Sequence, residues 1–186
     1  GARQAALETI DLGELVRQAL ADTVPFAASR GTELELDAQD GVTLQGDRVA
    51  LAALARNLAD NAVRYAPPGS HVQVGVAIEA GSPLLRVDDA GPGIPAADRE
   101  RVFDRFYRRQ VEDVGDGNGE AAQGTGLGLA IVKTVATRHG ARVTLGDSRR
   151  GAIRACGLTQ GCSQALSSSN SPHANTFPDR LGRAHP

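Results

Sequence analysis

The chain has 186 residues, of which 41% are hydrophobic and 23% charged, and its formal net charge is -2. This length and composition suit one globular domain with a real core. A near-neutral charge offers no basic surface, so neither nucleic acid nor an acidic membrane is expected as a direct partner. No apolar run is long enough to span a bilayer. Cys156 and Cys162 lack metal-binding spacing and are expected to be free thiols in a reducing compartment.

The first part of the chain predicts a long helix and two short strands. Residues 1–10 are interpreted as the remnant of an upstream linker. A capping-box pattern begins at Asp11, and the apolar residues after it recur at helical spacing, which predicts one helix to about Arg30. Alternating residues bounded by turns predict strands over 32–36 and 42–45.

The middle of the chain predicts a long helix followed by a hairpin. Residues 47–65 have an apolar helical stripe, and the prolines that follow end the helix. Residues 72–78 alternate between apolar and polar or small side chains, which predicts a strand with one buried face. Residues 84–87 are its expected hairpin partner, and a short helix is expected over 96–103.

The last part of the chain changes character twice. Residues 109–123 are rich in glycine and acidic residues and predict a mobile loop. A helix is expected to follow to about His139, and strands over 142–145 and 152–156. From Gly157 onward the composition turns to Ser, Asn, Pro and Gly without periodicity, so residues 157–186 are predicted to be a disordered tail.

A glycine-rich stretch, Gly124-Thr125-Gly126-Leu127-Gly128, leads directly into the predicted helix that ends near His139. Glycines let the backbone approach a bound group closely, and the free N–H groups of a helix start attract anions. This pattern indicates a phosphate cradle, although it lacks the Lys-Ser/Thr ending of a Walker loop. Taken alone, it is also compatible with a tight turn that only begins a helix.

Four polar residues gather on the predicted helix 47–65: Asn57, Asn61, Arg64 and Tyr65. Their spacing places them on one face. A carboxamide oxygen is a hard ligand for Mg²⁺, an arginine pairs with phosphate, and a tyrosine ring lies against a base. The alternative is an ordinary solvated face, although two asparagines inside a helix cost some helix propensity.

Asp89 ends a predicted strand and is followed by Gly91, Gly93 and Ile94. A carboxylate in this position can accept a hydrogen bond from the exocyclic amine of adenine, and the glycines leave room for the ring. The same glycines fit a dinucleotide-binding fingerprint, which we reject because the preceding strands are expected to be antiparallel and Pro95 lies inside the pattern. The alternative is a tight turn without a ligand.

Three of the six aromatic residues, Phe103, Phe106 and Tyr107, lie together before the predicted mobile loop. They suit an aromatic anchor at the base of the loop, and Arg108 would reach a phosphate when the loop closes. Simple core packing is the alternative for the two phenylalanines. No histidine has metal-ligand spacing, and all four are expected to be solvated: His71, His139, His173 and His185.

Taken in order, these stretches resemble the catalytic ATP-binding domain of bacterial sensor histidine kinases. Residues 57–65 are similar to the family's asparagine box, 89–93 to its first glycine box, 103–108 to its phenylalanine box and 124–129 to its second glycine box. The similarity covers roughly residues 8–156. Four motifs in the same order make a chance match a poor explanation.

The resemblance implies an α/β (α+β) two-layer sandwich, in which a mixed, mainly antiparallel sheet carries three helices on one face. The catalytic domain would span 11–156, with 109–123 as the lid over ATP. Asn61 would hold Mg²⁺ with help from Asn57, and Arg64 would contact phosphate. The remaining nucleotide-binding positions implied are Tyr65, Asp89, Gly91, Gly93, Ile94, Arg108, Gly124, Thr125, Gly126, Leu127 and Gly128.

The resemblance also implies the partners and the place of the reaction. The phosphoacceptor histidine of the family lies in a dimerisation hairpin before this domain, and no histidine of this chain has that setting. The implied partners are therefore that hairpin and, downstream, a response regulator. The domain is expected in the cytoplasm, with the parent protein an inner-membrane sensor. Alternatives are a nucleotide-binding regulatory module without kinase activity and a fragment of another ATPase of the same fold.

Overall fold

The computed structural model describes residues 7–107, 126–146 and the backbone of 151–156. The described strands are β1 (Glu8–Asp11), β2 (Glu33–Ala38), β3 (Thr43–Gly46), β4 (His71–Glu79), β5 (Ser82–Asp89), β6 (Arg142–Leu145) and β7 (Gly151–Cys156). The helices are α1 (Leu12–Ala21), α2 (Val24–Ser29), α3 (Arg48–Tyr65) and α4 (Gly128–Arg138), with short 3-10 turns η1 (Ala96–Asp98) and η2 (Arg101–Phe103).

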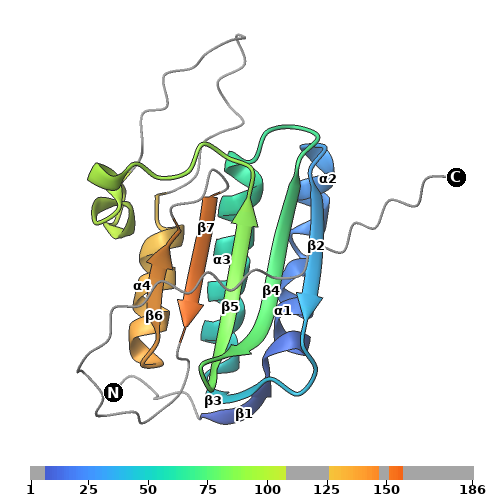
Figure 1. Ribbon diagram of the computed structural model, residues 1–186, viewed down its shortest axis with the longest axis vertical. Helices are drawn as coiled ribbons and strands as arrows, with labels where there is room; N and C mark the ends of the chain where they lie inside the picture. The colour runs from blue at the N-terminus through green and yellow to red at the C-terminus, as the bar shows by residue number, and fades with distance from the viewer. Residues whose placement is uncertain (1–6, 108–125, 147–150, 157–186) are drawn as a thin grey trace, which may run out of the picture.

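The chain folds into two layers, a sheet and a set of helices behind it (Figure 1). The main sheet has the strand order β2-β4-β5-β7-β6, and β1 pairs with β3 in a separate two-stranded sheet. Only β2 and β4 run parallel, and the other three neighbouring pairs of the main sheet are antiparallel. The predicted mixed, mainly antiparallel sheet with helices on one face is confirmed.

The β4–β5 hairpin forms where the alternating pattern predicts it. The valines at 72, 74 and 76 point to the helices and are at most 2% exposed. Ala80 and Gly81 make the turn with φ of 48° and 77°, the pair of positive angles that a tight two-residue hairpin requires. This hairpin carries Asp89 at the end of β5 to the edge of the helical layer.

Helix α3 is the central element of the helical layer. The side chain of Asp47 accepts a hydrogen bond from the backbone N–H of Ala50 and so caps the helix, as predicted. Leu51, Leu54 and Leu58 are at most 1% exposed. Their burial between the sheet and the neighbouring helices fixes the rotation of α3, which places its polar residues on the remaining face.

The single helix expected to reach Arg30 is wrong. Helix α1 ends at Ala21 and a separate short helix, α2, begins at Val24. The physical reason is Pro25, which lies in the first turn of α2 and is not accommodated inside a helix. Between the helices, Thr23 is fully buried and its hydroxyl donates to Asp60 at 2.8 Å, which ties the break to α3.

The two short strands expected after the first helix are confirmed as β2, which pairs with β4, and β3, which pairs with β1. Two further expectations need correction. Residues 8–10, assigned to a linker, belong to β1, and Ile10 is completely buried. The helix expected over 96–103 is two 3-10 turns, because the chain leaves the helical hydrogen-bond pattern at Arg99 and Glu100 between them.

Two expected segments lie outside the described residues: the loop 109–123 and the tail 157–186. The expected strands near the end are confirmed as β6 and β7. Among the described residues, no helix is both long and apolar enough to cross a membrane.

Candidate functional site

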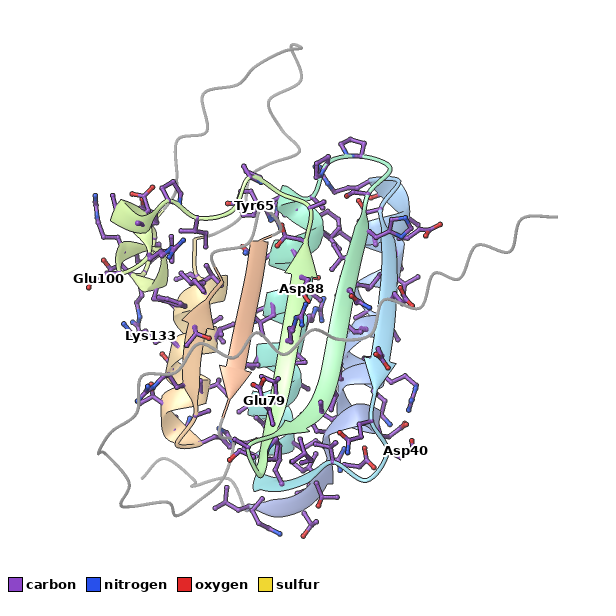
Figure 2. All side chains as sticks on the ribbon, viewed as in Figure 1. Asp40, Tyr65, Glu79, Asp88, Glu100 and Lys133 are labelled. Carbon is purple, nitrogen blue, oxygen red and sulfur yellow. The ribbon has the colours of Figure 1, made fainter. Side chains whose placement is uncertain are left out.

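The predicted site residues come together at one end of the sandwich. The last turn of α3, the end of β5 and the first turn of α4 lie at the same end of the molecule (Figure 1), and Tyr65 marks that end in Figure 2. Two close approaches join these elements: Gly91 against the last residue of α3, and Gly128 against Asn57. Motifs that are up to 71 positions apart in the sequence (128 minus 57) therefore form one surface.

Asn57 presents its carboxamide oxygen toward the start of α4. Its Nδ2 donates to the carbonyl of Ala53 at 2.7 Å, which fixes the amide orientation. Its Oδ1 lies 3.1 Å from the place where a Cβ on Gly128 would stand. Asn61 is half-buried one turn further along the same face of α3. The face thus offers neutral oxygen acceptors beside a helix start.

Arg64 and Tyr65 complete this turn of α3 with different surroundings. The guanidinium of Arg64 lies 5.4 Å from the ring centroid of Phe26 on α2. Such a cation–π contact contributes only about 0.5–1 kcal/mol at an exposed site. Tyr65 is 42% exposed, so part of its side chain is within reach of a ligand or solvent.

Asp89 and Gly91 form a tight turn against α3. The N–H of Gly91 donates to Oδ1 of Asp89 at 2.7 Å. A Cβ on Gly91 would stand 2.6 Å from that oxygen and 2.7 Å from the backbone oxygen of Tyr65, so only glycine fits. Burial raises the pKa of Asp89 above its ordinary value, the Gly91 hydrogen bond opposes this, and nearby Asp88 adds to it.

The segment after this turn is more open. Gly93 adopts a φ of 69°, and a Cβ at this position would meet no atom within 4 Å, so its requirement for glycine comes from the backbone angle. Ile94 is half-buried, and its carbonyl accepts a hydrogen bond from Nε of Arg99 at 3.1 Å. Gly93 and Ile94 thus belong to the segment that connects β5 to η1.

The aromatic residues join the two sides of the segment 108–125. The N–H of Phe106 donates to the carbonyl of Gly126 at 3.0 Å, and Gly126 has a φ of 68°. Phe106 is 72% exposed, which overturns the core-packing alternative for this residue. Phe103 is half-buried, and the guanidinium of Arg101 lies 5.1 Å from the centroid of the Tyr107 ring. The backbone contact with Gly126 joins the two flanks of the segment, while an anchoring role for the aromatic rings stays a prediction.

The remaining predicted positions divide into two groups. Leu127 precedes α4 directly and is half-buried beside Gly128. Arg108, Gly124 and Thr125 lie outside the described residues.

One histidine differs from its prediction. His139 is only 6% exposed, not solvated. Its Nε2 accepts from the backbone N–H of Asp47 at 3.0 Å, and its Nδ1 pairs with the carbonyl of Val135 at 2.8 Å. The ring therefore connects the end of α4 to the N-cap of α3, and the two hydrogen bonds favour the tautomer protonated at Nδ1. His71 is exposed, as predicted.

The site also contains contacts that the sequence pattern did not reveal. Phe26 was not singled out, yet it holds the guanidinium of Arg64. Its separation from Arg64 along the chain leaves no periodic signal that would have found it. Pro25, in contrast, was a visible sign that a new element starts just before Phe26.

The chemistry of the donor set suits a nucleotide with its counterion. Backbone glycines and a helix start suit phosphates, and the buried carboxylate suits an amine donor. Among the described residues, no group of three His, Cys, Asp or Glu is placed to hold a metal ion. A cation here would therefore depend on amide oxygens together with ligand and water oxygens.

Comparison with known proteins decides the family. The family model described as "Histidine kinase-, DNA gyrase B-, and HSP90-like ATPase" matches residues 46–164. This chain belongs to that ATPase family. The domain is therefore an ATP-binding catalytic module of this family. The matched range includes the Asp89 turn, the start of α4 and the face of α3 that carries Asn57 and Asn61, which we call the asparagine face.

The relatives of this ATPase module are sensor kinases. The chain is 39% identical over 150 residues to the swarming motility regulation sensor protein RssA of Serratia marcescens, covering 78% of this chain and 30% of that protein. A solved structure of the mycobacterial sensor histidine kinase MprB matches with a TM-score of 0.67 and 30% identity over 81% of this chain and 96% of that one. Full-length ShkA in complex with AMPPNP matches with a TM-score of 0.69 and 26% identity, over 85% of this chain and 32% of that one.

The share of each relative that this chain covers shows which part of those proteins it resembles. The chain spans about 30% of the length of the curated relative RssA, and 96% of the solved MprB chain. The module is therefore similar to the catalytic domains of sensor histidine kinases.

Proposed function

We propose that this ATPase module is the phosphoryl-donor half of a two-component sensor kinase. It would bind Mg·ATP and orient the γ-phosphoryl group toward a histidine on a dimerisation hairpin, from which a response regulator is then phosphorylated. The observation that carries the proposal is the convergence of Asn57, Gly128, Asp89 and Gly91 on one surface. Its use of ATP agrees with a cytoplasmic location.

The asparagine face fits a hard divalent cation. The Oδ1 of Asn57 is directed toward the start of α4, and a Cβ on Gly128 would lie only 3.1 Å from it. Mg²⁺ prefers oxygen ligands and keeps several waters, so two amide oxygens and the phosphates suffice. We assign Asn61 as the principal ligand and Asn57 as its support. The cation would neutralise charge on the phosphate oxygens.

The other side chains would bind and orient the nucleotide. Asp89 is half-buried and hydrogen-bonded on one oxygen by Gly91, so its second oxygen is the acceptor assigned to the adenine amine. Tyr65 would flank the base. Arg64 would exchange its contact with Phe26 for a phosphate, since a charge-assisted hydrogen bond is stronger than an exposed cation–π contact.

Catalysis in such a module would consist of positioning and electrostatic stabilisation. Holding the donor in line with an acceptor replaces a bimolecular encounter by an intramolecular one. Phosphoryl transfer needs little covalent chemistry from the protein, so no nucleophile is required within this chain. The N–H groups at Gly126 and Gly128 would stabilise phosphate oxygens.

A calorimetric titration with ATP and ADP, with and without Mg²⁺, is the first test. We expect adenine-nucleotide binding, loss of binding in Asp89→Asn, and tighter ATP binding when Mg²⁺ is present. A folded protein that binds no nucleotide would contradict the proposal. The exposed amide of Gln18 on α1 provides a matched control, Gln18→Ala, which should bind as the wild type does.

Transfer is tested separately, by adding the purified dimerisation hairpin of the parent kinase with radiolabelled ATP. We expect label on the hairpin histidine, and its loss in Asn61→Ala. Normal transfer by Asn61→Ala would refute the metal-ligand assignment. Nucleotide binding without transfer would instead support a regulatory module that lacks kinase activity.

A further inference from the structure

A second concave surface contains none of the residues assigned to nucleotide binding, although it includes Phe103 of the aromatic group described above. It lies between η2, the outward face of α4 and the start of β6, and its volume is about 790 Å³. We call it the α4 groove. Ala136 and Val143 line it together with Phe103, so part of its surface is apolar. Its volume is in the range of ligand-binding clefts.

The rim of the α4 groove carries an excess of positive charge. Arg99, Lys133 and Arg142 line it, against one carboxylate, Glu100. This local excess stands out because the whole chain has a net charge of -2. Within the described part of the chain, Lys133 and Arg142 form no ion pair. Both are exposed, so their charge is directed at solvent.

The groove has a defined shape. The ammonium of Lys133 lies 5.5 Å from the ring centroid of Phe103, so the cation of α4 and the aromatic residue of η2 hold the two walls together. Figure 2 shows Lys133 and Glu100 at the same edge of the molecule. Strand β6 is the last strand of the sheet on this side among the described residues.

We propose that the α4 groove binds an acidic segment of a partner protein, one that carries aliphatic side chains beside its carboxylates. The aliphatic groups would cover the partly exposed Ala141 and Val143, and the carboxylates would pair with Lys133 and Arg142. Charge complementarity of this kind gives specificity and speeds association.

The observations favour a peptide over other polyanions. A nucleic acid would need a basic surface that tracks several phosphates, and the overall negative charge of the chain opposes it. An anionic membrane presents a flat array of headgroups, whereas these exposed cations surround a hollow whose wall is partly apolar. An acidic peptide with aliphatic side chains complements both features.

The test is a selection of random twelve-residue peptides displayed on phage, using the full chain as target. The selected pool is counter-selected on the double variant Lys133→Glu/Arg142→Glu, and the consensus peptide is then synthesised and titrated by fluorescence anisotropy. We expect a consensus rich in Asp, Glu and aliphatic residues. The double variant should bind it at least about tenfold more weakly, and added salt should weaken the wild-type complex.

The matched control is Arg17→Glu/Arg138→Glu, which changes the net charge equally at exposed positions outside the groove. It should keep wild-type peptide affinity, and all variants should keep their circular dichroism and nucleotide binding. No enriched peptide, a neutral or basic consensus, or equal binding by both double variants would overturn the proposal. So would preferential binding of a dT12 oligonucleotide or of phosphatidylserine vesicles. Because nucleotide binding is measured independently, failure here leaves the proposed function standing.

Discussion

The Oδ1 atom of Asn57 lies 3.1 Å from the position that a Cβ on Gly128 would occupy. This close approach brings the middle of α3 against the first residue of α4, two elements separated by the whole hairpin and the segment after it. The amide cannot turn away freely, because its Nδ2 is held by the carbonyl of Ala53 at 2.7 Å. The absence of a side chain at Gly128 therefore leaves the space that the carboxamide oxygen of Asn57 faces.

Gly128→Ala is expected to weaken Mg·ATP binding by about tenfold while leaving the fold intact. The added methyl requires Asn57 Oδ1 to shift by a few tenths of an ångström, a small change in packing that the fold tolerates. Calorimetry and thermal unfolding measure the two effects. Gly75→Ala is the control, since its Cβ would meet only Arg86 at 3.9 Å. Unchanged affinity in Gly128→Ala would show that the orientation of Asn57 does not matter.

Gly91 and Gly93 offer a paired test of close approach against backbone strain. Alanine at 91 would clash with the backbone oxygen of Tyr65 at 2.7 Å, which cannot move without disturbing the end of α3. We expect Gly91→Ala to lower the free energy of unfolding by about 2–4 kcal/mol. Gly93→Ala meets open space and incurs only the left-handed backbone cost, about 1 kcal/mol. Urea unfolding of both variants measures the difference, and equal losses would contradict this explanation.

The elements predicted well are those with strong local patterns. Helix α3 was located to within one residue because Asp47 caps it and a proline follows it. The β4–β5 hairpin was found from its alternating residues. Such patterns depend on neighbours within one element, and a single sequence contains them in full.

The features that were missed depend on contacts between distant segments. Ile10 was placed in a linker because its burial requires β1 to pair with β3, more than thirty positions away. His139 was expected in solvent because its partner, the N–H of Asp47, is 92 positions away. No periodicity encodes either contact. The candidate site also depends on contacts between distant segments. Its residues could still be listed from the sequence, because four motifs occur in the same order as in the family.

His139 is expected to be a stability residue and not a ligand of the nucleotide. It is 6% exposed and joins the end of α4 to the N-cap of α3 through Asp47. His139→Ala removes the acceptor of the Asp47 N–H and opens a cavity, whereas the carbonyl of Val135 keeps the backbone N–H of residue 139 as its donor at 3.1 Å. We therefore expect a loss of about 2–3 kcal/mol in the free energy of unfolding.

The exposed histidine supplies the control for this experiment. His71 pairs with Glu33 at 2.8 Å on the surface, where such pairs contribute below about 1 kcal/mol. His71→Ala should therefore leave the urea midpoint almost unchanged. A loss at His139 no larger than at His71 would mean that the connection between α4 and α3 contributes little.

We expect the ionised carboxylate of Asp89 to lower the free energy of unfolding at neutral pH, although the same carboxylate is the acceptor assigned to the adenine amine. Burial raises its pKa, so the fold favours the protonated carboxyl. The stability from this group is fully present below the unfolded-state pKa, about pH 4, and is lost as pH rises through the raised folded-state pKa. Asparagine does not titrate, and its amide oxygen still accepts the Gly91 hydrogen bond. Asp89→Asn should therefore become more stable relative to the wild type as pH increases.

Urea unfolding of Asp89→Asn and wild type at pH 4, 5.5 and 7 tests this expectation, with calorimetry of ATP binding at pH 7. The difference in midpoint should widen with pH in favour of the variant, while nucleotide binding is lost. Asp40→Asn, at an exposed carboxylate, controls for the removal of one negative charge. A difference in midpoint that stays constant across the three pH values would show that ionisation of Asp89 does not lower the free energy of unfolding. Binding retained by the variant would separate the burial of this carboxylate from adenine recognition.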